Sequence, residues 1–167
     1  MKDNLPEPWL RGPLEGVHPL VMPVFFTFLQ VREDLRKHLS DLPGEAVWRK
    51  VDGASVGFHL KHMAGTVDRL TTYLTGEQLS EEQLRTLREE NAGNENLEEL
   101  LRLLEDNLRA SEDKLRQIDP DTLYDSRSVG RRALPTTVIG LIVHLAEHTQ
   151  RHLGQAVTTS KLLRQMG

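Results

Sequence analysis

The sequence predicts an all-α protein, a four-helix bundle with one short connecting helix. Four long segments place apolar residues at the three- and four-residue spacing of one helix face, and no run of any length alternates with the two-residue period of a strand. Composition agrees with this, because the chain is rich in Leu and only 5% aromatic, a balance that favours helices over sheets.

The chain length predicts a single domain over residues 1–167, since 167 residues can enclose a hydrophobic core without disulfides or a structural metal. Residues 1–17 are rich in Pro and Gly and predict an extended N-terminal arm. Within the arm, Trp9 is the residue expected to pack against the body.

The first two long helices are predicted from apolar seams and their stop signals. Apolar positions recur at helical spacing from His18 onwards, and that helix should end before Pro43. The second helix should begin near Ser55 and end at Thr75, where Gly76 offers a C-terminal stop. The core seam of the second helix is expected to contain Leu60, Met63, Val67, Leu70 and Leu74.

The second half of the chain supplies the connecting helix and two more long helices. The stretch SEEQLRTLREEN opens at Ser80 in a pattern that matches a capping box, so it predicts the short connecting helix, with charges that mark a solvated face. Residues 96–118 predict the third long helix, and residues 136–163 predict the last. Between them, 121–135 is expected to form an irregular loop, with a short hairpin considered around Ser128 to Gly130.

Charge and hydropathy narrow the classes of partner. A formal net charge of −4 gives no reason to expect nucleic-acid binding, which usually requires a basic surplus. No segment has the roughly 18 apolar residues that span a bilayer, and the N-terminus lacks a signal-peptide pattern, so we expect a cytoplasmic protein. The absence of Cys fits that compartment and removes Cys from every catalytic or metal-binding scheme.

Histidine clustering is the most informative feature of the sequence. Five of the seven histidines fall in the two stretches F-H-L-K-H-M and H-L-A-E-H-T-Q-R-H. On a helix, His144, His148 and His152 spread over about 80° of one face, beside Leu141 and Leu145, so they should point into the bundle. A buried imidazole is costly unless its nitrogens are paired, and one explanation is hydrogen bonding to neighbouring core or rim groups.

Metal binding is the alternative explanation of these histidines. A pair at i and i+4 can place two ring nitrogens on one ion, although the motif needs a third ligand from elsewhere. His59 and His62 on the second helix supply candidates for that third ligand. Three consecutive i, i+4 ligands would span about 12 Å of helix, too far for one ion, so His144 is expected to be a core or cavity-wall residue.

A polar strip runs along the second helix beside its apolar seam, formed by His62, Thr66, Arg69 and Tyr73. It predicts either one wall of a cavity or a boundary face with solvated Arg and Tyr tips. The spacing H-T-Q-R-H lacks the glutamate of the HExxH metalloprotease motif. Glu147 lies about 100° around the helix from His148, so it should face outward or brace a neighbour.

Three stretches of the chain together resemble the DinB-like superfamily of small metal-binding four-helix bundles. They are S-V-G-F-H-L-K-H-M-A-G, S-V-G-R-R-A-L-P-T-T-V-I-G-L-I-V-H-L-A-E-H and the closing H-T-Q-R-H-L-G-Q. The resemblance implies an up-down-down-up bundle, often dimeric, with three histidines that hold zinc, nickel or a similar divalent ion. By position these ligands are His62, His148 and His152, and Leu153 stands where many members carry Arg.

The resemblance also frames the functional hypotheses. The superfamily includes enzymes that transfer low-molecular-weight thiols such as bacillithiol, a mycothiol-dependent isomerase, and proteins with no known activity. The leading hypothesis is a metal-dependent transferase that moves a low-molecular-weight thiol to an electrophilic small molecule, in a chain that forms a homodimer. Arg69 or Tyr73 would then hold an anionic group of the substrate, as would the loop residues Arg127, Arg131 and Arg132 at a cavity mouth.

Two other classes of function compete with the transferase. One is a stress-associated or scaffold protein whose metal site is structural or vestigial. The other is hydrolysis by a metal-activated water, which requires a general base that the spacing of carboxylates does not reveal.

Overall fold

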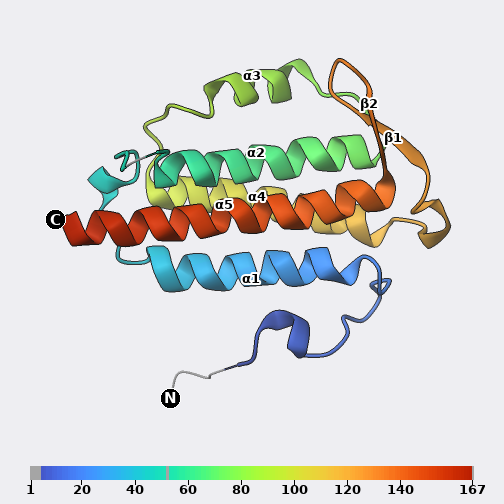
Figure 1. Ribbon diagram of the computed structural model, residues 1–167, viewed down its shortest axis with the longest axis horizontal. Coiled ribbons are helices and arrows are strands. Elements are labelled where there is room, and N and C mark those ends of the chain that lie inside the picture. Colours follow the sequence, from blue (N-terminus) through green and yellow to red (C-terminus); the bar gives the residue numbers. More distant parts are fainter. Residues whose placement is uncertain (1–4, 52, 167) are drawn as a thin grey trace.

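The computed structural model describes residues 5–51 and 53–166, and these residues form a mostly helical protein with five α-helices and one small sheet (Figure 1). The helices are α1 (Met22–Leu39), α2 (Val56–Leu74), α3 (Glu81–Glu89), α4 (Leu97–Arg116) and α5 (Val138–Met166). Short 3-10 turns occupy Pro8–Leu10, Gly44–Ala46 and Pro120–Thr122. Every predicted helix is therefore present, with ends that differ from the predictions by a few residues.

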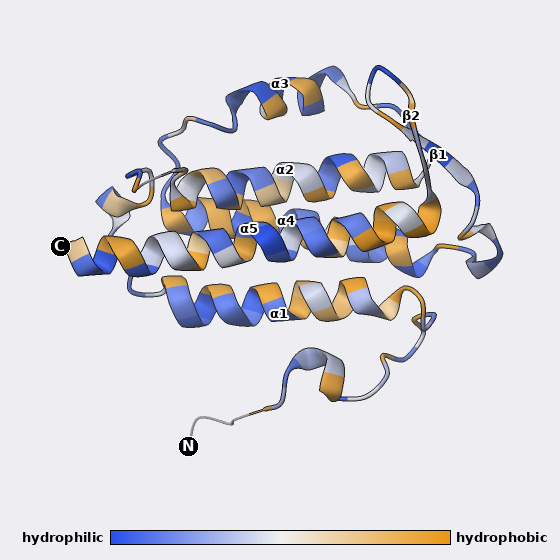
Figure 2. Ribbon diagram, in the orientation of Figure 1, coloured by the Kyte–Doolittle hydropathy of each residue, from blue (hydrophilic) through white to orange (hydrophobic). Residues whose placement is uncertain are grey.

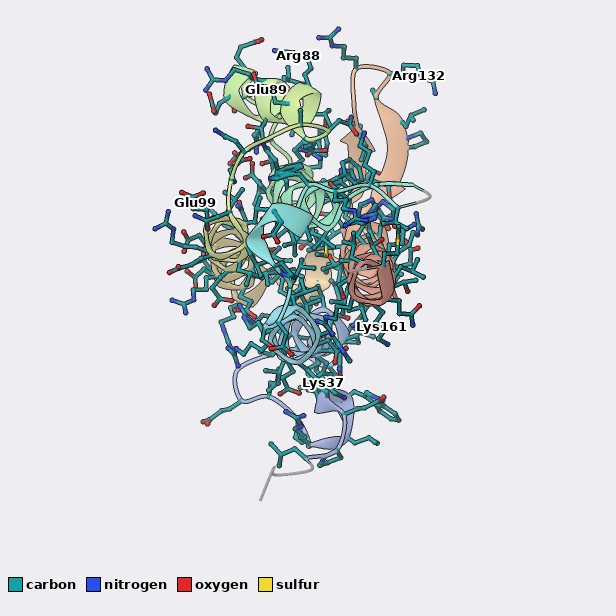
Figure 3. The ribbon with its side chains drawn as sticks, turned by 90° about the vertical axis from the view of Figure 1, so that its left-hand side faces the viewer. Lys37, Arg88, Glu89, Glu99, Arg132 and Lys161 are labelled. Atoms are coloured by element: carbon teal, nitrogen blue, oxygen red, sulfur yellow. The ribbon has the colours of Figure 1, made fainter. Side chains whose placement is uncertain are left out.

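The four long helices pack around one hydrophobic core. α2 contacts both α4 and α5, and α1 lies against α5 and, less extensively, α4. Seen end-on, the four helices surround the core, and the labelled charges Lys37, Glu99 and Lys161 project from its outside (Figure 3). Hydrophobic and hydrophilic segments recur turn by turn along each long helix, as expected of amphipathic helices (Figure 2).

Burial follows the predicted seam of α2 closely. Leu60, Met63, Val67, Leu70 and Leu74 are all buried. In α4 the buried leucines are Leu100, Leu104, Leu108 and Leu115, and Ser111 is also buried. Leu97 and Leu101 are partly buried and pack against the edge of the core.

Local hydrogen bonds explain where the helices begin. The Ser55 hydroxyl accepts from the Phe58 N–H at the start of α2, 3.1 Å away. Capping boxes open α3 at Ser80 and α4 at Asn96, so the pattern read at Ser80 is confirmed. These contacts satisfy N–H groups that have no partner inside the helix.

The loop before α5 contains a hairpin. β1 (Ser126–Val129) pairs antiparallel with β2 (Leu134–Thr137), with Ser126 opposite Thr137. Gly130, at a φ of +71°, follows β1 in a backbone conformation that suits glycine. The hairpin considered around Ser128 is thus present, and the fold is not purely helical.

The N-terminal arm differs from the prediction in its anchor. Within residues 5–17 there is no α-helix, in agreement with an arm, but Trp9 is 61% exposed and the neighbouring Pro8 is buried instead. The prediction that Trp9 packs on the body is wrong. Two hydrogen bonds from the Arg11 guanidinium to the Glu33 carboxylate, of 2.6 and 2.8 Å, hold the arm against α1.

Among the helices described, none is both long and apolar enough to cross a membrane.

Candidate metal centre

Three histidines from two adjacent helices converge between α2 and α5. His62 lies in the first half of α2, and His148 and His152 lie one turn apart in the middle of α5. One ring nitrogen from each lies within 4.8 Å of the other two, and all three side chains are partly buried. Because α2 and α5 are packed neighbours, the bundle brings the two sequence clusters together.

The donor set suits a divalent transition metal. Neutral imidazole is a common ligand of zinc and nickel, and three histidines leave a coordination position open. The Nε2 atoms of His62 and His148 lie 3.4 Å apart. Two nitrogens bound tetrahedrally to zinc at about 2.0–2.1 Å would be separated by about 3.4 Å, so this pair already fits.

Glu90 holds the other nitrogen of His62. Its Oε2 lies 2.6 Å from His62 Nδ1, and its Oε1 accepts a 2.6 Å hydrogen bond from Arg69 Nη1. Glu90 is 2% exposed, so both contacts are shielded from water. Sequence reasoning missed this residue, because it ends a run of charges that looks like a solvated face.

His59 holds the other nitrogen of His152. The two Nδ1 atoms lie 3.0 Å apart, and His59 is 5% exposed. If His152 is the donor in this contact, its Nε2 is left as the nitrogen available to a metal. The two histidines of α2 thus both reach the cluster, one beside His148 and the other behind His152.

His148 differs from the other two histidines in its second nitrogen. Within the described residues, His148 Nδ1 is buried and has no hydrogen-bond partner in the protein. A buried ring nitrogen without a partner is costly in an ordinary core. Nε2 is the His148 nitrogen that faces His62, so an ion held between these two rings would not satisfy Nδ1.

Burial keeps His59, His148 and His152 neutral by lowering their pKa values. Desolvation, followed by the proximity of His62, lowers the pKa of His59 and His148 to about 4. The same causes lower the pKa of His152 to about 3. Neutral imidazole is the form that binds metal, so protons compete weakly with a cation for these side chains near pH 7.

Arg69 and Tyr73, the predicted substrate-binding residues, occupy different surroundings. Arg69 is buried, and its guanidinium bonds to Glu90 and, through Nη2, to Thr66 Oγ1 at 3.1 Å. Its tip is therefore not solvated. Tyr73 is also buried, but it lies about 16 Å along the helix from His62, so the structure does not bring it to the histidines.

The loop arginines lie away from the cluster. Arg127 donates from Nε to the carbonyl of Leu74 at the end of α2, about 18 Å along that helix from His62. This contact fastens the hairpin to α2. Arg131 and Arg132 are exposed in the hairpin turn.

His144 does not have the environment predicted for it. Its side chain is 49% exposed, with Nδ1 3.3 Å from Glu147 Oε2. The prediction of a core or cavity-wall residue is wrong, because position 144 lies at the edge of the buried face of α5. Glu147 is exposed and also bonds to Arg151, as expected of a residue that braces its neighbours.

A surface groove of about 650 Å³ borders the cluster on the α5 side. His59 and His152 form part of its wall, together with Phe58, Gln155 and Leu162. The Phe58 ring stacks on His62 with centroids 5.2 Å apart and planes inclined by 12°. The groove therefore gives a small molecule with an apolar part access to His59 and His152 at one side of the cluster.

Comparison with known proteins identifies the fold family. A crystal structure of a Streptococcus pneumoniae protein from the Northeast Structural Genomics Consortium aligns with a TM-score of 0.61, covering 93% of each chain at 14% identity. That likeness shows a shared fold. A comparison with curated proteins found no match. The model of the DinB superfamily matches residues 27–156, which include all three clustered histidines, and the protein therefore belongs to the DinB superfamily.

Proposed function

We propose that this protein is a divalent-metal-dependent transferase that moves a low-molecular-weight thiol onto an electrophilic small molecule. The observation that carries the proposal is the convergence of His62, His148 and His152 within 4.8 Å beside an open groove. Zinc and nickel are the ions that best suit three neutral imidazoles.

The chain's own residues would hold the ion and orient the reactants. His62, His148 and His152 present nitrogens to one point, and Glu90 and His59 fix two of those rings from behind. A divalent cation, when bound, lowers the pKa of a thiol so that the thiolate forms near neutral pH. In the overall reaction the thiol proton passes to solvent, a sulfur–carbon bond forms, and the bond from carbon to the leaving group breaks.

The groove beside His152 supports a small-molecule substrate. Phe58 and Leu162 offer apolar surface, while Gln155 offers hydrogen bonds. An electrophile with an apolar or aromatic body would fit these walls. The predicted anion-binding role of Arg69 would require substrate to compete with Glu90, so the groove residues are the better candidates for substrate contact.

Hydrolysis by an activated water receives less support from the geometry. Glu90 is the buried carboxylate beside the cluster, and it contacts His62 through Nδ1, on the side of the ring away from His148. Both of its oxygens are already bonded, one to His62 and one to Arg69. Glu90 is therefore badly placed to act as a general base on a water between the histidines.

Metal content and thiol-dependent turnover test the proposal. Protein purified without added metal would be analysed for bound ions, loaded with zinc or nickel, and assayed with a generic haloaromatic electrophile and a panel of low-molecular-weight thiols. We expect stoichiometric metal and thiol-dependent product formation that His148→Ala abolishes. Metal without turnover across the panel would favour the structural-site alternative, and absence of metal binding would refute the proposal.

Three features of the overall organisation belong to the same proposal. The course of the colours in Figure 1 supports an up-down-down-up order, with α1 and α5 running opposite to α2 and α4. We also propose a single domain over 1–167 and a homodimer. Light scattering coupled to size exclusion would test the dimer, which a mass of 19.0 kDa in solution would contradict.

A further inference from the structure

The short helix α3 contributes little to the core by itself. None of its nine residues is buried, and it lies over α2 on the side away from α1 (Figure 1). The residue that follows it, Glu90, is 2% exposed. Arg88 and Glu89, by contrast, are exposed, and Arg88 projects from the outer side of α3 (Figure 3). α3 thus carries one buried carboxylate to the back of the histidine cluster.

We propose that Glu90 is a positioning residue that keeps His62 in the tautomer with its proton on Nδ1, so that the Nε2 lone pair faces His148 and His152. This inference rests on the proposed metal-binding function and adds a residue to it. An ionised carboxylate only accepts hydrogen bonds, so the 2.6 Å contact between Glu90 Oε2 and His62 Nδ1 requires the proton to be on Nδ1. Nε2, which lies 3.4 Å from His148 Nε2, is then left with its lone pair.

Arg69 pairs with Glu90 and fixes the orientation of its carboxylate. The guanidinium is donor-only, and its 2.6 Å contact with Oε1 leaves Oε2 for His62. Arg69 and Glu90 are respectively 7% and 2% exposed, so the ion pair is largely excluded from water. Removal of either charge would leave the other charge buried without its ionic partner, which is costly. The two side chains are therefore held in one relative orientation.

Gly65 leaves the space in which this ion pair lies. A Cβ at position 65 would come within 2.5 Å of Glu90 Oε1 and 2.6 Å of Arg69 Nη1. Any larger residue would therefore push the carboxylate or the guanidinium aside. The absence of a side chain at Gly65 therefore allows the ion pair to lie directly against the backbone of α2.

Contacts on both sides of Glu90 hold its segment in place. At the start of α3, Gln83 Nε2 donates to Asp68 Oδ2 at 2.9 Å and to Thr72 Oγ1 at 2.7 Å. After Glu90, Lys61 bonds to Glu95 at 2.6 Å, and Trp48 Nε1 donates to the Glu95 carbonyl at 2.9 Å. The position of Glu90 is thus fixed from both ends, as a residue that orients a ligand requires.

Glu90→Gln tests this role, because Gln has nearly the same shape as Glu but would donate a hydrogen bond to His62 Nδ1 instead of accepting one. Arg69 needs an acceptor, so the amide oxygen of Gln should turn to Arg69 and the amide NH2 should turn to His62. His62 Nδ1 must then accept, which moves the ring proton to Nε2 and blocks the metal-facing nitrogen. Glu89→Gln, at the exposed last residue of α3, is the matched control. Adding Arg69→Met to Glu90→Gln frees the amide oxygen for His62 and should restore the original tautomer.

Two readouts separate this inference from the metal proposal. Nitrogen-15 NMR of the imidazole rings of the metal-free protein at pH 8 reports the His62 tautomer without any ion. Competition with a chelator reports the zinc dissociation constant. We expect the Nδ1–H tautomer in the wild type and in Glu89→Gln, the Nε2–H tautomer in Glu90→Gln, and zinc binding weakened about 10- to 100-fold in that variant alone.

Each contrary outcome has a distinct meaning. An Nε2 proton on His62 in the wild type, measured without any substitution, would overturn the role of Glu90 even if Glu90→Gln failed to fold. Unchanged tautomer and unchanged zinc affinity in a folded Glu90→Gln protein would also overturn it. Wild-type protein that shows the Nδ1–H tautomer but binds no zinc would refute the proposed metal function while leaving the tautomer assignment supported.

Discussion

His59 and His152 face each other through their Nδ1 atoms, which lie 3.0 Å apart across the contact between α2 and α5. A hydrogen bond at this distance requires one ring to donate and the other to accept. If His152 donates, its Nε2 is left for a metal, and His59 supports His152 in the way that Glu90 supports His62.

Replacement of His59 by Leu should weaken metal binding without removing it. The substitution leaves His152 Nδ1 without its acceptor, so the ring loses its orientation, and we expect zinc affinity to fall about 10-fold or more. Chelator competition measures the change. His144→Leu is the control, because the exposed His144 should leave zinc affinity unchanged. Equal affinity in His59→Leu and wild type would show that His59 is only a packing residue.

Replacement of His148 by Ala should abolish metal binding and leave a folded protein. The Leu-rich core of the bundle provides most of the stability, so loss of the ion removes only the increment set by mass action. Native-like far-UV circular dichroism with cooperative melting, and no bound metal, is the expected result. An unfolded chain would instead mean that the ion is part of the fold, and would favour a structural site.

A substitution in the core of α4 should lower the stability of the protein without changing its zinc affinity. Leu104 is 1% exposed, and Leu104→Ala should lower the free energy of unfolding by about 2–5 kcal/mol through lost burial and a cavity. Leu103, 38% exposed on the same helix, should lose no more than about 0.5 kcal/mol when replaced by Ala. Denaturant titration measures both. Zinc affinity should remain at the wild-type value in both variants. A large loss of zinc affinity in Leu104→Ala would mean that the packing of α4 shapes the metal site.

Stability of the metal-free protein should decrease as the pH falls below neutrality. The pKa values of His59 and His148 are about 4 and that of His152 is about 3 in the folded state, against 6.5 for a solvated His, so the folded protein binds fewer protons than the unfolded chain. Their contribution is complete above pH 6.5 and is lost as the pH falls towards the folded values.

Denaturant titrations at several pH values between 7.5 and 5 test this dependence, a window that lies above the titration of most carboxylates. His152→Leu should show a shallower decline than the wild type, since one of the depressed histidines is gone. A flat profile in the wild type would contradict the buried, neutral state of these rings.

The sequence determined the helices, because the spacing of apolar residues within each long helix indicates which face is buried. Residues such as Leu60, Met63 and Val67 recur at helical spacing, and Ser55 and Asn96 supply the N-terminal caps, so element type and approximate ends follow from local patterns. The pair His148 and His152 also follows from local spacing, and the family pattern supplied His62. Local patterns carry less information at the edge of a helix face, and for this reason His144 was misplaced.

Only the tertiary structure decided which groups support those histidines. His59 and His62 lie three residues apart on α2, and the packing of α2 against α5 is what sets one behind His152 and the other beside His148. Glu90 sits in a charged run whose local character is that of a solvated face, and it is buried because α3 docks across α2 where Gly65 leaves room. The burial of a charge depends on a partner distant in sequence, here Arg69, and no periodicity within one helix encodes such a partner.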